Sequence, residues 1–432
     1  MTNQKVHSHE EILQATNAIR KKLVGKSLTY REIYSIMDQI AKKRLGDVLT
    51  TYFAASAYSK GFSNQELYYL TKAMVETGKQ IHFDGIVADK HSIGGVPGTR
   101  TTLVVIPIVA AAGFRIPKSS SRAITTPSGS ADSMEVLAPV NLSKEKIIKV
   151  VKKTNGCIVW GGSFGIAPAD DIIIKVEQPL LLESYDKILV SIMAKKVAFG
   201  SNHVVIDLPY GTTVKVHRLD DAKLLKEKFE YLAKKFNIEI RVLIHKTNEP
   251  AGRGVGPILE AREALRVLQQ KQNRPADLEI RCINLAGNLL DICLKDSPKK
   301  LQSFIKKNYG NSFGWATKIL HEGLAFKKMQ EIILEQGGNS NIDSEDLRPG
   351  RYSFEVKASK TGNIKSLDSK NITLISKILG APSKKGAGIF LNKKTGEAVK
   401  KDDTIATLYS ENKNSLEQGK NSISNFSLAK II

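Results

Sequence analysis

The feature that most constrains the fold is an alternation of short apolar runs with helical stretches, which begins near Ile81. Val204–Leu208 and Ile240–Ile244 are short apolar runs that we expect to form buried strands. Ser143–Lys152 and Glu260–Leu268 carry the pattern of helices between such strands. An alternation of strands and helices predicts an α/β domain.

The first 75 or so residues have a different pattern, which is helical throughout. Thr29–Glu32 is a capping box, in which a hydroxyl and a carboxylate stand three residues apart, and Ser63–Glu66 repeats the device. Apolar residues at helical spacing follow the first box: Ile33, Ile36, Met37 and Ile40. We therefore expect a small all-α domain whose apolar faces pack within the domain or against another subunit.

A third pattern follows Ser340. Phe354–Ala358 alternates with a period of two, and glycines recur about every ten residues, which predicts a β-rich domain. Ser410–Ser424 is polar, and we expect it to be loose. The predicted fold is thus an α/β multidomain protein. It has a small all-α domain, a large α/β domain with a mixed central sheet, and a C-terminal β-rich (α+β) domain.

The chain is strongly basic, with 65 Lys and Arg against 43 Asp and Glu and a net charge of +22. This charge favours anionic partners such as phosphorylated metabolites or nucleic acid, and it does not choose between them. No basic run reaches five residues, and no zinc-finger, RRM or KH signature occurs. We expect no specific nucleic-acid ligand, so a basic nucleic-acid-binding protein is kept only as a weak alternative.

Membrane insertion and disulfide formation are not expected either. No run of about 18 apolar residues occurs, so no transmembrane helix is predicted, and polar Met1–Glu11 lacks the apolar core of a signal peptide. Cys157, Cys282 and Cys293 are odd in number without CxxC spacing. We expect three buried, reduced thiols and a cytoplasmic protein.

Asp89–Thr102 is the first segment that points to chemistry. Gly94, Gly95 and Gly98 let the backbone approach a ligand closely and turn several N–H groups toward it. The apolar run that follows can begin a helix, whose N-terminus attracts anions. Lys90 adds a full positive charge, so the composition suits phosphate. The segment matches neither the Walker A nor the GxGxxG pattern, and alone it fits a purely structural turn equally well.

Pro117–Ser130 strengthens the phosphate interpretation, because it packs seven hydroxyls and two cations into fourteen residues. A solvated Ser/Thr loop is the alternative. Two such segments in one α/β domain favour a pocket with convergent polar groups. Asp170 and Asp171 are adjacent and would chelate a metal poorly, so we expect them to cap a helix and predict no metal site. No G-x-S-x-G nucleophile elbow occurs.

Several segments resemble the thymidine phosphorylase/pyrimidine nucleoside phosphorylase family, and the resemblance covers nearly the whole chain. The family motifs are matched at Lys90–Val96, Ile166–Asp171, Ser191–Lys196 and Lys385–Ile389. Two further segments are more similar to the AMP phosphorylase branch: Gly94–Gly98 and Ser121–Thr126. That branch commonly carries an additional N-terminal domain, most of which we expect this chain to lack.

The resemblance implies a subunit of three domains. A helical domain at 1–78 is completed by about 167–199, an α/β domain takes 79–166 and 200–338, and the C-terminal domain takes 339–432. The implied active site is the cleft between the first two domains. Homodimers are implied to form through the helical domains.

The implied reaction is phosphorolysis of an N-glycosidic bond, which gives a free base and a pentose 1-phosphate. Phosphate itself attacks, so the reaction needs no protein nucleophile and no cofactor, in keeping with the absence of a nucleophile motif. The implied partners are a small nucleoside or nucleotide and inorganic phosphate, in pyrimidine metabolism or nucleotide salvage.

The resemblance also assigns residues. His91 stands close to the base, and Glu183 replaces the Asp proton donor of the AMP branch. The phosphate ligands are Lys90, Ser92, Thr102, Ser120 and Ser130. Base and nucleotide contacts are Gly95, Ser121, Arg122, Ala123, Ile124, Thr125, Thr126, Ser191, Lys195 and Lys215.

Substrate choice follows from charge. Arg122 matches the geometry of a phosphate with its two-pronged guanidinium, and Lys215 adds a second cation, so we expect a nucleoside 5′-monophosphate. Thymidine itself is the alternative substrate. A phosphoribosyltransferase of the anthranilate type is a further alternative. It would need Mg²⁺ and carboxylates to hold it, and the tip of the glycine segment has no acidic residue.

Overall fold

A computed structural model describes residues 2–163, 165–177 and 184–432. The chain divides into two compact units. The helical unit comprises Met1–Val87, Gly161–Val204 and Lys223–Ile240, and the main unit comprises Ala88–Trp160, Val205–Ala222 and Arg241–Ile432. This division is coarser than the three domains predicted from the sequence, whose boundaries stay predictions.

The helical unit is built on helices with the predicted caps. The Thr29 and Ser63 side chains accept the N–H groups of Glu32 and Glu66, which confirms both capping boxes. The apolar face of the second helix is buried, as predicted. The helices are α1 Thr2–Leu23, α2 Tyr30–Ala41, α3 Gly46–Lys60, α4 Asn64–Glu76, α8 Pro168–Glu177, α9 Tyr185–Ala198 and most of α10 Leu219–Lys235.

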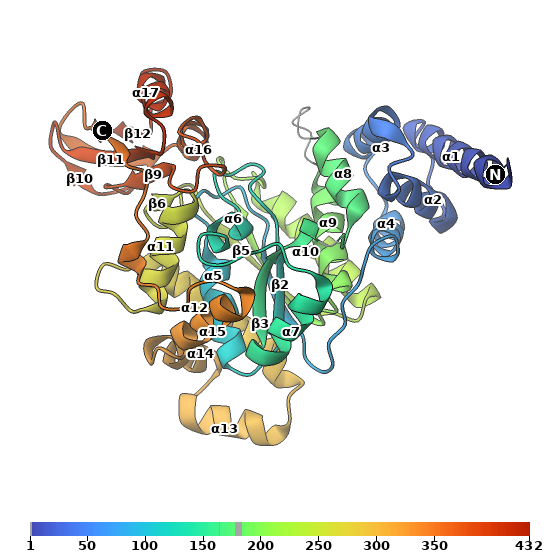
Figure 1. The fold of residues 1–432 in the computed structure, drawn as a ribbon, viewed down its shortest axis with the longest axis horizontal. Coiled ribbons are helices and arrows are strands. Elements are labelled where there is room, and N and C mark those ends of the chain that lie inside the picture. The colour runs from blue at the N-terminus through green and yellow to red at the C-terminus, as the bar shows by residue number, and fades with distance from the viewer. Residues whose placement is uncertain (1, 164, 178–183) are drawn as a thin grey trace. The chain divides into compact units, whose positions relative to one another are not determined.

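Strands and helices alternate in the first part of the main unit, as the sequence predicts (Figure 1). The predicted strands lie within β4 His203–Tyr210 and β5 Glu239–Lys246, which form a sheet of order β1-β4-β5. Strands β2 and β3 run parallel side by side. The other strands of this part are β1 Ala88–Ser92, β2 Ile116–Ser120 and β3 Gly156–Trp160.

Helices surround these strands. Helix α5 (Thr101–Ala111) is buried along ten of its residues, Thr101–Ala110, which explains its unbroken apolar sequence. None of the described helices is both long and apolar enough to span a lipid bilayer. The other helices of this part are α6 Ser130–Met134, α7 Lys144–Thr154, α11 Pro257–Leu268, α12 Ala276–Lys295, α13 Lys299–Tyr309, α14 Ser312–His321 and α15 Leu324–Gln336, with a 3-10 turn at Ser344–Asp346. A second 3-10 turn, Gly161–Ser163, belongs to the helical unit.

The last part of the main unit holds two small sheets, of order β6-β9-β11-β7 and β10-β8-β12. Their strands are β6 Gly254–Val255, β7 Tyr352–Lys357, β8 Gly362–Leu367, β9 Gly388–Leu391, β10 Ala398–Val399, β11 Thr404–Ser410 and β12 Ala429–Ile431, with helices α16 Ser369–Ile378 and α17 Lys413–Ser422. The predicted fold class, an all-α domain, an α/β domain and a β-rich C-terminal domain, is therefore confirmed.

The expectation of a loose segment at Ser410–Ser424 is wrong, because α17 occupies most of it. The Asn412 side chain accepts the N–H groups of Asn414 and Ser415 and so caps the helix. Leu416 is buried in the C-terminal core. A cap and one buried leucine stabilise a helix that composition alone did not indicate.

Candidate active site

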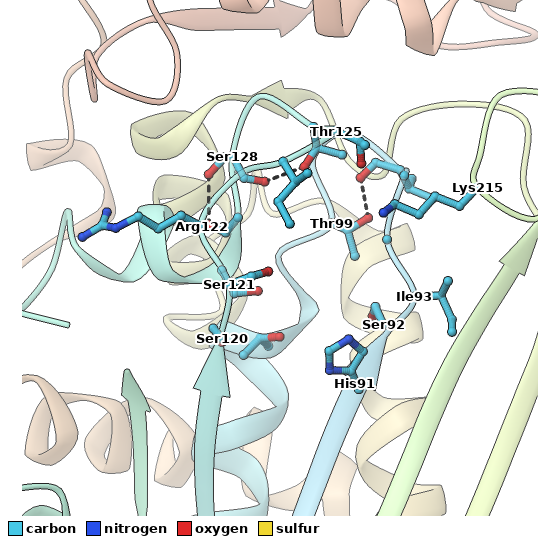
Figure 2. A pocket seen from close by; sticks show the side chains of 18 of the residues that line it. His91, Ser92, Ile93, Thr99, Ser120, Ser121, Arg122, Thr125, Ser128 and Lys215 are labelled. Carbon is cyan, nitrogen blue, oxygen red and sulfur yellow. Dashed lines mark hydrogen bonds between the residues drawn. The ribbon is translucent and has the colours of Figure 1, made fainter. Parts of the chain in front are cut away.

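A pocket in the main unit opens where β1 and β2 end, at Ser92 and Ser120 (Figure 2). Its cavity volume is about 130 Å³, which is room for several water molecules. Most residues assigned from the sequence line it: Lys90, His91, Ser92, Gly95, Thr102, Ser120, Ser121, Arg122, Ile124, Thr125, Thr126, Ser130 and Lys215.

Four assigned residues are not among those that line this pocket. Ala123 is in the same loop but is not part of the pocket lining. Ser191 and Lys195 belong to the helical unit. Glu183 lies outside the described residues. Sequence reasoning left out other residues that line the pocket, among them Thr99, Lys118 and Ser128. Lys118 and Ser128 stood within the predicted Ser/Thr-rich segment, which was their only sequence signal.

Lys90 supplies a buried positive charge to the lining of this pocket. Its Nζ donates hydrogen bonds to Ser92 Oγ at 2.7 Å and to Thr101 Oγ1. Burial lowers the pKa of Lys90 to about 8, although the nearby Asp207 carboxylate opposes the shift. The ammonium group is therefore mostly protonated at neutral pH, and a bound anion would favour its charged form.

Asp207, in β4, holds the side chains around Lys90 in place. Its carboxylate accepts hydrogen bonds from Ser92 Oγ at 2.7 Å, from His245 Nε2 at 2.9 Å and from Arg281 Nη2 at 3.0 Å. Burial raises the pKa of Asp207, but the His245 hydrogen bond and the charges of Arg281 and Lys90 outweigh burial and hold that pKa well below its usual range. Asp207 was not predicted as a site residue, although a carboxylate inside an apolar strand indicates that a charged or hydrogen-bonding partner is buried beside it.

Ser120 presents a hydroxyl to the pocket. The residue is 7% exposed, and its Oγ has no hydrogen-bond partner among the described residues. Side chains alternate along a strand, so Lys118 and Ser120 share one face of β2 and both line the pocket, whereas Ser119 points to the other face. A buried hydroxyl without a partner is costly unless a ligand or water satisfies it.

The glycine loop, Gly94–Gly98, packs against the backbone at Lys215, away from Ser120. Gly95 has a φ of +81°, and a Cβ there would lie 2.8 Å from the Lys215 backbone nitrogen. Only glycine permits this close approach. Figure 2 shows Lys215, Thr125 and Ser128 at one end of the pocket and His91, Ser92 and Ser120 at the other. The pocket thus has a cationic group at each end.

Arg122 does not present its guanidinium as the sequence interpretation required. Its Nη1 and Nη2 donate to both carboxylate oxygens of Glu135 at 2.7 and 2.6 Å, and Nη1 also donates to Asp132 at 3.2 Å. Figure 2 shows the guanidinium turned away from Ser92 and Lys215. The geometry that suits a phosphate is therefore occupied by a carboxylate of the protein itself.

Ser191 and Lys195 form a polar cluster with Asp170 in the helical unit. The Asp170 carboxylate accepts a hydrogen bond from Ser191 Oγ at 2.7 Å and pairs with Lys195 Nζ at 2.7 Å. Lys195 Nζ also donates to Ser191 Oγ at 3.1 Å. Asp170 lies inside the first turn of α8, and its carboxylate pairs with these two side chains; the predicted helix cap at Asp170 stays a prediction.

Three family models match the chain. A glycosyl transferase family α/β domain matches residues 84–303, which is more than half of the chain. A glycosyl transferase family helical bundle domain matches residues 16–78, and a pyrimidine nucleoside phosphorylase C-terminal domain matches residues 363–427.

Full-length relatives agree with these models. A Legionella pneumophila (strain Paris) protein named "Putative thymidine phosphorylase" is 41% identical over 95% of this chain and 76% of its own length. The AMP phosphorylase of Thermofilum pendens is 41% identical over 93% and 75%, and that of Methanococcus aeolicus is 41% identical over 96% and 80%.

The fold has a solved counterpart in the anthranilate phosphoribosyltransferase of Thermus thermophilus. The two align with a TM-score of 0.60 over 74% of this chain and 99% of the other, at 15% identity. At that identity the likeness concerns the fold alone. The family models and the relatives show that this chain belongs to the glycosyl transferase family that includes the thymidine and AMP phosphorylases.

Proposed function

We propose that this protein cleaves the N-glycosidic bond of a nucleoside or nucleoside 5′-monophosphate with inorganic phosphate. A phosphate oxygen bonds to C1′, the C–N bond breaks, and the base leaves with the bonding electrons and takes up a proton. The products are a free base and a pentose 1-phosphate, or ribose 1,5-bisphosphate from a substrate such as AMP. The observation that carries the proposal is the convergence of Lys90, Ser92 and Ser120 on one pocket at the ends of β1 and β2.

Positioning and charge account for the chemistry. Lys90 and the hydroxyls of Ser92 and Ser120 would hold the phosphate, and the bound anion would stabilise positive charge that grows on the sugar as the base departs. His91 lines the same pocket and would lie beside the leaving base. Glu183, outside the described residues, is our proposed proton donor.

Ser191 and Lys195 are proposed to bind the base. Both lie on α9 and are hydrogen-bonded to the same carboxylate, that of Asp170, so their donors are held in fixed positions. Lys195→Ala should raise KM for the nucleoside and leave KM for phosphate nearly unchanged. An equal rise in both constants would contradict a role at the base.

We further propose a nucleoside 5′-monophosphate as the preferred substrate, with thymidine as the alternative. Lys215 stands at the end of the pocket away from Ser120, where a second anionic group would be bound. Relatives named AMP phosphorylase and thymidine phosphorylase are equally similar in sequence, so charge decides the choice. Lys215→Ala should lower kcat/KM for the monophosphate about tenfold or more and affect thymidine little.

One assay tests the reaction itself. The purified protein is incubated with AMP, CMP, UMP, thymidine and uridine, with and without phosphate, and release of free base is measured. Phosphate-dependent release from a monophosphate is expected. Release from thymidine at equal or higher kcat/KM would overturn the substrate proposal and leave the reaction intact. No phosphate-dependent release from any member would overturn the reaction.

We propose that the reaction needs no metal or other cofactor, because Lys90, Lys118 and Lys215 bring positive charge to the pocket lining. Activity should therefore persist in EDTA. Loss of activity in EDTA and its restoration by Mg²⁺ would favour phosphoribosyl transfer instead.

We propose a homodimer formed through the helical unit, in the cytoplasm. Leu13, Val48 and Tyr52 in α1 and α3 are 57%, 70% and 53% exposed, which leaves apolar surface for a second copy to cover. The three cysteines are free and buried, as a reducing compartment permits. Light scattering should give twice the chain mass, and Val48→Asp should reduce it. A monomeric wild type would overturn the dimer.

A further inference from the structure

The Ser/Thr loop, residues 121–130, closes on itself beside the pocket. Gly129 packs so closely that a Cβ would lie 2.5 Å from the Ser121 carbonyl oxygen. Asp132 Oδ2 accepts the backbone N–H groups of Ala123 at 2.7 Å and Gly129 at 2.9 Å, one from each side of the loop. Asp132 is 2% exposed, so a buried carboxylate links the two sides of the loop by hydrogen bonds.

Arg122 joins the same carboxylate to a second one. Its guanidinium makes a two-pronged contact with Glu135 and also reaches Asp132. It stacks over the Trp160 ring, 5.1 Å from the ring centre. The hydrogen bonds from Arg122 and then Lys385, together with their charges, lower the pKa of Glu135 to about 2, so the Arg122–Glu135 pair is fully ionised at neutral pH.

Two lysines beyond residue 370 complete the arrangement. Lys385 Nζ lies 2.8 Å from Glu135 Oε2 and 3.5 Å from Asp132 Oδ1. Lys377, in α16, donates a 3.0 Å hydrogen bond to the Ile124 carbonyl oxygen within the loop. The loop is therefore held both by Asp132 and Glu135, which follow it in the sequence, and by two lysines from the C-terminal part of the main unit.

We propose that Arg122, Asp132, Glu135, Lys377 and Lys385 form a loop clamp that shapes the Ser/Thr loop for the substrate, with Arg122 acting on the substrate only through Glu135. This inference rests on the proposed function and deepens it. The clamp residues are positioning residues: they place Ser121, Thr125 and Thr126 against the pocket. Sugar and 5′-phosphate recognition then comes from the loop hydroxyls, its backbone N–H groups and Lys215.

A double-mutant cycle separates the clamp from direct recognition. Arg122→Ala, Glu135→Ala and the double variant are assayed with AMP and with the corresponding nucleoside. If Arg122 acts through Glu135, each single variant should raise KM about tenfold for both substrates, kcat should change little, and the double variant should match the singles within about twofold. Loss confined to the monophosphate in Arg122→Ala, with Glu135→Ala unaffected, would overturn the clamp and make Arg122 a phosphate ligand.

The C-terminal contribution has a matched control. Lys385→Ala should raise KM for the nucleotide, whereas the exposed neighbour Lys384, whose side chain makes no ion pair within the described residues, should tolerate Lys384→Ala. Equal kinetics for the two variants would remove Lys385 from the clamp.

A readout without substrate keeps this inference separate from the proposed function. In a Trp315→Phe background, Trp160 is the single tryptophan, and Arg122→Ala and Glu135→Ala should shift its fluorescence similarly. Unchanged fluorescence in both variants would overturn the clamp whatever the activity. An inactive wild type with coupled fluorescence changes would overturn only the function.

Discussion

Ser92 Oγ donates a 2.7 Å hydrogen bond to Asp207 Oδ2, although 115 residues separate the two in the chain. The bond joins the end of β1 to the neighbouring strand β4 and fixes the hydroxyl beside Lys90. His245 and Arg281 hold the other side of the same carboxylate. These bonds orient the Ser92 side chain and, through it, the Lys90 ammonium group. Because a hydroxyl has one proton, Ser92 would donate to a bound phosphate only by giving up its bond to Asp207, whereas Lys90 has further N–H donors.

Removing the negative charge of Asp207 should leave the Ser92 and Lys90 side chains less firmly oriented. Asp207→Asn should raise KM for phosphate about tenfold or more, because Ser92 and Lys90 lose their common anchor. The exposed Asp220→Asn serves as control. Thermal melting of both variants shows whether the protein stays folded. A folded Asp207→Asn variant with unchanged phosphate kinetics would refute the anchoring role.

The pKa of Lys90, lowered to about 8 by burial, makes phosphate use dependent on pH. The cation is lost as pH rises through about 8, so kcat/KM for phosphate should fall above that pH, by up to tenfold per unit. Bound phosphate stabilises the cation, so at saturating phosphate the fall should move to higher pH. Lys90→Arg stays charged and should flatten the profile. A flat wild-type profile between pH 7 and 9.5 would count against Lys90.

Two adjacent serines test which face of β2 carries the phosphate contact. Ser120→Ala should raise KM for phosphate about tenfold, because a hydrogen bond to a charged ligand contributes about 1.5–3 kcal/mol. Ser119→Ala should leave KM unchanged, since Ser119 is not in the pocket lining and its Oγ also has no partner among the described residues. Equal effects from the two serines would exclude a specific contact at Ser120.

Arg100 should be important for stability. It is fully buried, pairs with Glu263, and donates to the carbonyl oxygens of Gly98, Ala251 and Gly254 at 2.9, 2.8 and 2.6 Å. Arg100→Ala leaves a buried carboxylate unpaired and should cost about 3–5 kcal/mol in urea unfolding. Replacing both Arg100 and Glu263 by leucine should cost less than that single change. A single variant as stable as the wild type would contradict the pairing.

Much of the fold follows from sequence patterns. The capping boxes at Thr29 and Ser63, the strands within β4 and β5, and the helix after the glycine loop depend on residues a few positions apart, so local spacing determines them. The two polar loops of the pocket are also visible in the sequence, because glycines and hydroxyls gather there. Helix α17 was missed because a cap and a buried leucine, rather than periodicity, stabilise it.

The direction of the Arg122 side chain was decided by tertiary structure. From the sequence, its guanidinium and the surrounding hydroxyls suit a phosphate, but folding brings Glu135 and Lys385 to the same place, and the carboxylate takes both prongs of the guanidinium. Likewise, Asp207 gains His245 and Arg281 as partners only when β4, β5 and α12 come together. Composition and local spacing determine which groups are available and which elements form. Charge pairing between distant segments depends on how those elements pack, and it decides which polar groups remain for a ligand.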